Sequence, residues 1–198
     1  MLEQVSEKAA DWLISKGAAK KEDRDIYVYG LELSFSTLFS VFLILVLAIV
    51  FSDILYGILF LLCMFTIRFF CGGYHATTYL NCCLCSNSLF LASLGITLFT
   101  PEWLVLPLTL GICVISGLYV FIKTPIENDN NPMTEKKLKR NRRISRTIIS
   151  VQSTLIVLGA FLLPQFASYT YMASLATGVV AILMLVAKLQ KRRKEVKA

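Results

Sequence analysis

The segment SFSTLFSVFLILVLAIVF, residues 34–51, decides the fold because its 18 consecutive residues include no charge, glycine or proline. A helix needs about 20 predominantly apolar residues to cross the hydrocarbon core of a bilayer, with a range of roughly 17 to 25. A helix that is apolar all round is suited to burial or to lipid, not to water. The sequence therefore predicts that residues 34–51 cross a membrane.

Apolar segments farther along the chain predict five more spans. These are residues 54–67, 82–99, 103–122, 147–163 and 169–187. The first of them is short, so we expect its helix to continue through Arg68 toward Cys71. Very short links should make helical hairpins of spans one and two, three and four, and five and six. Charged residues make up 17% of the chain, against about 25% in soluble domains. We predict an all-α polytopic membrane bundle of six transmembrane helices.

The basic residues are confined to four regions. Five precede the first span, one is Arg68, eight lie in residues 123–146 and six follow the last span, which accounts for all 20. With six spans these regions share one side, and the positive-inside rule makes that side cytoplasmic. We expect a multi-pass cell-membrane protein with both termini inside. A bilayer with anionic lipids explains the net charge of +7 better than nucleic acid does, so no nucleic-acid partner is expected.

The pattern divides the chain into three parts. Residues 1–33 form a cytoplasmic N-terminal segment, residues 34–187 the transmembrane domain and residues 188–198 a basic cytoplasmic tail. Apolar residues between Leu2 and Ile14 recur at helical spacing, which predicts an amphipathic helix on the inner membrane surface. A solvated cytosolic helix is the alternative. No apolar region near the start indicates a cleavable signal peptide, so the first span is expected to be retained.

The segment RFFCGGYHATTYLNCCLC, residues 68–85, concentrates reactive side chains between spans two and three. It holds the only histidine, His75, and four of the six cysteines. Gly72 and Gly73 are natural helix enders. Histidine titrates near neutrality and is the candidate general base, and a thiol with a pKa of about 8.5 needs such a base to attack as thiolate. The alternatives are a hydrogen-bonded interfacial histidine and cysteines that act as small buried hydrophobes. All six cysteines are expected to be unpaired.

The spacing of His75 and Cys82 constrains how they could cooperate. They are seven residues apart, so a straight helix would separate them by roughly 10 Å along its axis. Proton transfer needs about 3 Å or one bridging water. We therefore expect the helix to break between them, near Thr77 and Thr78, with Cys82 at the start of span three. Whether residues 68–85 re-enter the membrane stays open.

Three residues of this segment form a spaced pattern. Arg68, His75 and Cys82 are separated by six residues each, and Gly73 lies two before the histidine. The pattern resembles the accessory gene regulator protein B (AgrB) family, membrane cysteine peptidases that process the precursor of a cyclic quorum-sensing peptide in Gram-positive bacteria. The resemblance extends to the chain length, the amphipathic N-terminus, the spans and the basic central loop. That loop opens with TPIENDNNPM, residues 124–133, where Asn131 stands in a place that is often lysine in the family.

The resemblance implies roles for individual residues. His75 corresponds to the catalytic histidine and Cys82 to the nucleophile, while Arg68 and Gly73 match positions that the family pattern also holds. The choice of Cys82 over its neighbours rests on the resemblance. A third catalytic residue is not evident, and Asn81 and Asn87 are candidates only.

The resemblance also implies a reaction. The precursor peptide would lie on the inner leaflet, Cys82 would attack where the signal region meets an acidic tail, and a thioester would form. A cysteine or serine of the peptide would then close a thiolactone or lactone. The active site would face the cytoplasm and the protein would be a homodimer.

Arg68 could bind a tail carboxylate or assist an oxyanion, or it could be a snorkelling interface residue. The basic residues Lys136, Lys137, Lys139 and Arg140 could steer the acidic tail, although topology and anionic lipid explain the same charges and are the favoured interpretation.

Two rival functions are open at this point. Cys71, His75, Cys82, Cys83 and Cys85 could ligate a metal in a transporter or sensor. The set lacks the paired arrangement of two CxxC motifs, however, and the adjacent Cys82 and Cys83 would hardly chelate together, so we expect no metal and no cofactor. A permease that exports a peptide without cleaving it is the second rival, but the internal repeats and paired mid-membrane charges typical of transporters are missing from the sequence.

Overall fold

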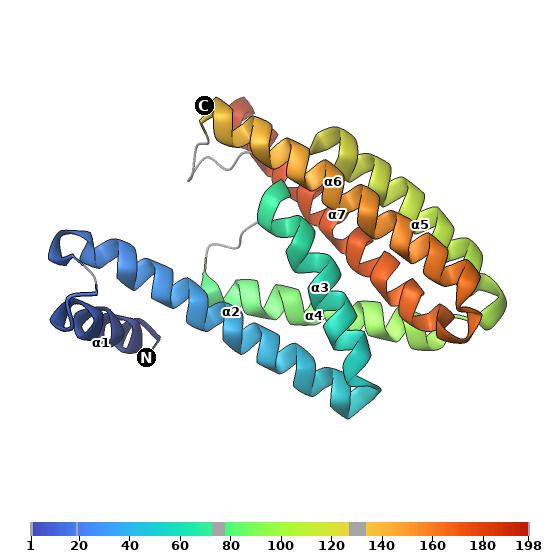
Figure 1. Ribbon diagram of the computed structural model, residues 1–198, viewed down its shortest axis with the longest axis horizontal. Helices are drawn as coiled ribbons and strands as arrows, with labels where there is room; N and C mark the ends of the chain where they lie inside the picture. The colour runs from blue at the N-terminus through green and yellow to red at the C-terminus, as the bar shows by residue number, and fades with distance from the viewer. Residues whose placement is uncertain (1, 19, 73–77, 127–133, 198) are drawn as a thin grey trace.

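The computed structural model describes residues 2–18, 20–72, 78–126 and 134–197, and its elements there are helical. Six of its helices are long and apolar enough to cross a membrane, which confirms the predicted multi-pass all-α fold (Figure 1). The helices are α1 Leu2–Ser15, α2 Arg24–Phe51, α3 Ile54–Cys71, α4 Tyr79–Phe99, α5 Glu102–Lys123, α6 Glu135–Leu162 and α7 Ala167–Lys197. Two short 3-10 turns, Lys21–Asp23 and Pro164–Phe166, precede α2 and α7.

Three of the helices extend well beyond the apolar segments. Helix α2 begins at Arg24, α6 begins at Glu135 and α7 continues to Lys197. The boundaries expected at residues 33/34 and 187/188 therefore fall inside continuous helices. The polar extensions remain helical because the helix, once nucleated, adds one backbone hydrogen bond for each further residue.

Helix α7 occupies the centre of the bundle and packs against α3, α4, α5 and α6. Its buried face is rich in small side chains, including Ala173, Ser174, Ala176 and Thr177. Small residues allow helices to approach closely in lipid, where no hydrophobic effect drives them together. Helix α7 therefore positions the other spans, including the two that border the reactive segment.

The link between α2 and α3 is fixed by Asp53. Its carboxylate accepts a hydrogen bond from the backbone N–H of Leu55 at 2.9 Å, which caps α3. The same carboxylate accepts one from the Tyr169 hydroxyl of α7 at 2.9 Å, and the Tyr169 ring stacks on Tyr56 with centroids 4.6 Å apart. This end of the hairpin is thereby tied to the central helix.

Helix α1 is present as the sequence predicts, and it packs against the first part of α2. Its buried residues are the small Ser6 and Ala10, whereas Val5 and Trp12 are exposed. Arg24 pairs with Asp11 at 2.7 Å, and this hydrogen bond lowers the pKa of the Asp11 carboxyl below its usual range. The side chains of Val5 and Trp12 thus stay available to a membrane surface.

Gly57 provides a test of how closely α2 and α3 pack. A Cβ at this position would lie 2.9 Å from the Cβ of Ala48, closer than side-chain atoms approach one another. We expect Gly57→Ala to force the helices apart and to lower the free energy of unfolding by about 1–3 kcal/mol. The measurement is unfolding in detergent micelles followed by circular dichroism. Gly95→Ala is the matched control, because nothing lies within 4 Å of its Cβ. An equal loss in both variants would contradict the close α2–α3 contact.

Candidate active site

The end of α3 is shaped by Gly72, which follows the last helical residue, Cys71. Gly72 has a φ of 69°, in the left-handed region that glycine adopts without strain. A Cβ there would lie 2.5 Å from the carbonyl oxygen of Ile126. Helix α3 therefore ends at Gly72 for two reasons, its backbone conformation and the close approach of another segment.

That other segment is the start of the predicted loop motif. Residues 124–126 cross the end of α3, and the Ile126 N–H donates to the Cys71 carbonyl at 2.9 Å. The bond satisfies one of the carbonyls that a helix C-terminus leaves without an intrahelical partner. Thr124 is buried at this crossing. The structure thus joins the loop after α5 to the reactive segment, although 55 residues separate Cys71 from Ile126 in the chain. Asn131 lies outside the described residues.

Of the two residues that the family resemblance implies to be catalytic, His75 and Cys82, the structure describes only Cys82. His75 and Gly73 lie outside the described residues, whereas Cys82 lies in the first turns of α4. Thr78 caps this helix: its hydroxyl accepts from the Asn81 N–H at 3.3 Å, and its carbonyl accepts from the Cys82 N–H at 3.1 Å. Because α3 ends at Cys71 and α4 begins at Tyr79, His75 and Cys82 do not share one of these helices.

The structure distinguishes the four cysteines of the segment by their surroundings. Cys71 is fully buried and its thiol donates to the Ile67 carbonyl at 3.0 Å. Cys85 packs against the apolar core, and the Cys83 sulfur lies 3.4 Å from the Asn87 amide nitrogen. Cys82 is half-buried, and no hydrogen bond joins its sulfur to the parts of the chain that the structure describes. All six cysteines are free thiols, as predicted.

Asn87 forms a polar contact in the interior of the bundle. Its amide donates to the Cys83 carbonyl at 2.8 Å and to the Ser40 hydroxyl of α2 at 3.2 Å. The side-chain oxygen of Asn87 is buried and has no hydrogen-bond partner in the described structure. Asn87 therefore faces Cys83 and α2, whereas Asn81, the other candidate third catalytic residue, is exposed.

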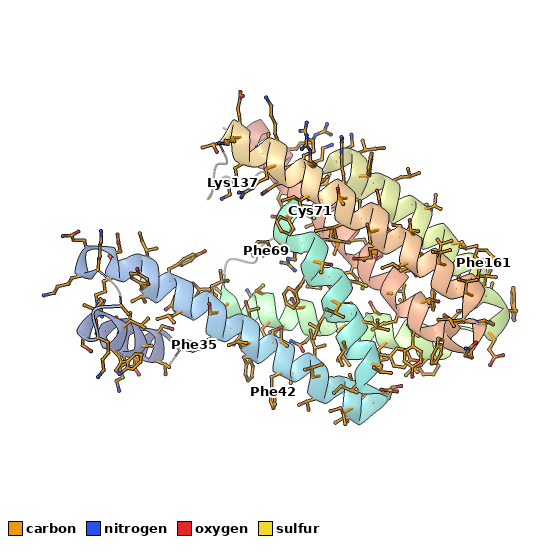
Figure 2. The ribbon with its side chains drawn as sticks, viewed as in Figure 1. Phe35, Phe42, Phe69, Cys71, Lys137 and Phe161 are labelled. Atoms are coloured by element: carbon orange, nitrogen blue, oxygen red, sulfur yellow. The ribbon has the colours of Figure 1, made fainter. Side chains whose placement is uncertain are left out.

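Arg68 lies in the last turn of α3 and is half-buried. A cation at this end of a helix is favoured by the negative end of the helix dipole. The position thus has a structural benefit that does not depend on substrate. Figure 2 shows Cys71 at the end of α3 and Lys137 near the start of α6, at the same end of the bundle.

The basic residues divide into two groups. Lys136, Lys137, Lys139 and Arg140 are exposed at the beginning of α6, where positive charge opposes the helix dipole. Arg146 is different: its guanidinium donates to the Phe121 carbonyl at 3.0 Å and lies over the Phe121 ring at 4.9 Å from the centroid. Arg146 therefore caps the C-terminal end of α5. The four exposed residues at the beginning of α6 do not cap α5.

Two residues that form hydrogen bonds with the candidate site were not identified from the sequence. Ser40 on α2 bonds to Asn87, and Ile126 bonds to Cys71. A serine within a span is a weak signal, because hydroxyls in membrane helices mostly bond to their own backbone. An isoleucine that acts through its backbone N–H leaves no signal in the sequence at all.

These features define a multi-pass membrane protein with a half-buried cysteine in the first turns of one span. The family model for accessory gene regulator B (AgrB) matches residues 6–187. An AgrB-like protein of Listeria innocua is 31% identical over 96% of this chain and 92% of its own length. An AgrB-like protein of Clostridium perfringens is 27% identical over 82% of this chain and 78% of its own. No solved structure matches. The chain belongs to the AgrB family.

Gly72 allows the crossing at the end of α3 to be tested. We expect Gly72→Ala to lower the stability of the protein in two ways. An L-residue at this φ strains the backbone, at a cost of about 1–2 kcal/mol, and its Cβ clashes with the Ile126 carbonyl oxygen. Gly17→Ala is the control, since Gly17 has nearly the same φ, 71°, and nothing within 4 Å of its Cβ. Thermal unfolding in detergent should show a clearly larger loss for Gly72→Ala. Equal losses would mean that the crossing contributes nothing beyond backbone strain.

Proposed function

We propose that this protein is an integral-membrane cysteine endopeptidase that removes the C-terminal tail of a quorum-sensing peptide precursor. Membership of the AgrB family supports a role in autoinducer processing. The observation that carries the finer proposal is the position of Cys82, half-buried in the first turns of α4 and directly after the segment that holds His75.

Cys82 lies in the first turns of α4, close to the helix N-terminus. The unpaired N–H groups and the dipole of a helix N-terminus stabilise negative charge in the first turn. The other cysteines of the segment are buried, packed in the core or contacted by Asn87. Cys82 is therefore the thiol best placed to react, which agrees with its position in the family pattern.

The reaction is an acyl transfer in two steps. His75 takes the thiol proton, and the Cys82 sulfur attacks the carbonyl that joins the signal region to the tail. The C–N bond breaks, the tail amine takes the proton from His75, and the signal region remains as a thioester. A cysteine or serine of the peptide then attacks this thioester, closes a thiolactone or lactone and restores Cys82. Exclusion of water favours closure over hydrolysis, and a site at the edge of the bilayer provides it.

Other residues assist binding in this proposal. Arg68 and Gly73 belong to the reactive segment and serve the substrate carboxylate or the oxyanion. The exposed Lys136, Lys137, Lys139 and Arg140 attract an acidic tail. Their position at a helix start, where they oppose the dipole, supports a role other than helix stability. The site and both termini face the cytoplasm, two copies form a dimer, and the chemistry requires no metal or cofactor.

The decisive experiment uses alanine variants of the clustered thiols. The protein in vesicles is incubated with a synthetic precursor peptide, and intact mass is measured to detect a thioester adduct and the released tail. We expect Cys82→Ala to abolish both, with a loss of at least about 10³-fold in tail release, because nucleophile and base act as a unit.

Cys83→Ala and Cys85→Ala are the matched controls and should keep most of the activity, while Cys71→Ala reports the effect of a buried thiol. If tail release survives Cys82→Ala but is lost in Cys83→Ala, the nucleophile is Cys83 and not Cys82. Transport of an uncleaved peptide without any adduct would overturn the peptidase proposal in favour of a permease.

A further inference from the structure

Helix α2 packs against α4 and contacts it through two polar side chains. Ser40 accepts a hydrogen bond from the Asn87 amide at 3.2 Å. The Glu32 carboxylate interacts with the Tyr79 hydroxyl both by a hydrogen bond and by its charge. In each pair the α4 residue follows the α2 residue by 47 positions, so both contacts belong to one parallel register of the two helices. Figure 1 shows the start of α4 beside the middle of α2.

Glu32 is the last charged residue of α2, and residues 33–51 after it are uncharged. Its side chain is half-buried where the helix enters the apolar span. A carboxylate at the edge of hydrocarbon is costly unless it is paired with a donor. The Tyr79 hydroxyl is such a donor, and a hydrogen bond to a carboxylate is roughly twice as strong as one between neutral groups. This contact therefore holds the first residue of α4 at one height on α2.

The two contacts flank the neighbouring thiols. Tyr79 is the first residue of α4 and Asn87 lies two turns farther along, so Cys82 and Cys83 fall between them. Cys82 comes three residues after Tyr79, which places both on one side of the helix. The end of a helix frays readily because its backbone groups lack intrahelical partners. A contact at Tyr79 therefore acts on the turn that carries the Cys82 sulfur.

We propose that Glu32 and Ser40 of α2 are positioning residues, which hold the start of α4 and thereby fix the Cys82 thiol. Neither residue takes part in the chemistry. The inference rests on the proposed function, in which Cys82 is the nucleophile. Positioning is decisive for such a group, because a displacement of 1 Å caused by a change away from the reacting atoms can cost about 10²-fold in rate.

The first test is the rate of tail release from a synthetic precursor peptide by the protein in vesicles. We expect Glu32→Ala to lower kcat by about 10- to 100-fold with little change in KM, because the substrate contacts remain while the nucleophile is displaced. Glu32→Gln should recover most of the rate, since its amide oxygen still accepts from the Tyr79 hydroxyl. Glu22→Ala, which removes an exposed carboxylate before α2, is the matched control and should leave the rate unchanged.

The second contact has its own pair of variants. Ser40→Ala should lower kcat less than Glu32→Ala does, because a hydrogen bond between neutral groups is the weaker of the two. Ser34→Ala is the matched control and should leave kcat unchanged, since the exposed Ser34 hydroxyl donates to the Gly30 carbonyl of its own helix at 2.8 Å.

A further readout needs no peptide. The protein in vesicles is treated briefly with iodoacetamide, and the alkylated cysteines are located by mass spectrometry of its fragments. We expect Cys82 to be alkylated faster than Cys83, and the ratio of the two rates should fall toward one in Glu32→Ala. A role of Glu32 in stability alone would lower the unfolding temperature and leave this ratio unchanged in the folded protein.

Two outcomes overturn the inference. One is a Glu32→Ala variant whose kcat and alkylation ratio equal those of Glu22→Ala. The other is a loss of rate that Glu32→Gln does not recover, which would assign Glu32 a role through its charge. Tail release that persists in Cys82→Ala overturns the proposed function instead. Circular dichroism checks that each variant folds, and if Glu32→Ala does not, Tyr79→Phe removes the same contact from the side of α4 and decides.

Discussion

In hydrocarbon, no water is available to hydrogen-bond a backbone N–H or C=O, and every structural choice in this protein follows from that constraint. Inside the spans the helices satisfy their own backbone. At a helix end, four carbonyls or four N–H groups lose their partners, so another group must serve them. Asp53 does so at the start of α3, Thr78 at the start of α4 and Ile126 at the end of α3. In the part of the chain that the structure describes, irregular backbone therefore lies where spans end.

The sequence predicted the six spans well because lipid imposes a minimum apolar length that composition alone reveals. It did not predict how far the helices continue beyond the lipid. Residues 135–146 are mostly charged and residues 24–33 mix charged with apolar side chains, and their helical state depends on packing and on propagation from the adjoining span. A hydrophobic pattern carries no information about such extensions.

Only those features of the site that depend on the spacing of residues along the chain could be predicted from the sequence. A helix boundary near Thr77 and Thr78 was expected from spacing if His75 and Cys82 cooperate, and α4 begins at Tyr79, although His75 lies outside the described residues. The contacts that distinguish one thiol from another are tertiary. The bond from Ser40 to Asn87 joins residues 47 apart, and the crossing of Ile126 over Cys71 joins residues 55 apart. Neither depends on a side-chain type that a sequence pattern would single out.

The unequal lengths of the helices have a geometric consequence for anything that approaches the site. Helix α3 has 18 residues and ends after roughly 27 Å, whereas the 28 residues of α6 reach roughly 42 Å and the 31 of α7 roughly 46 Å. The basic ends of α6 and α7 thus project past the end of α3 (Figure 1). Cys71 and Gly72 lie about 15 Å below the height that this overhang reaches, which an extended chain of four or five residues would span.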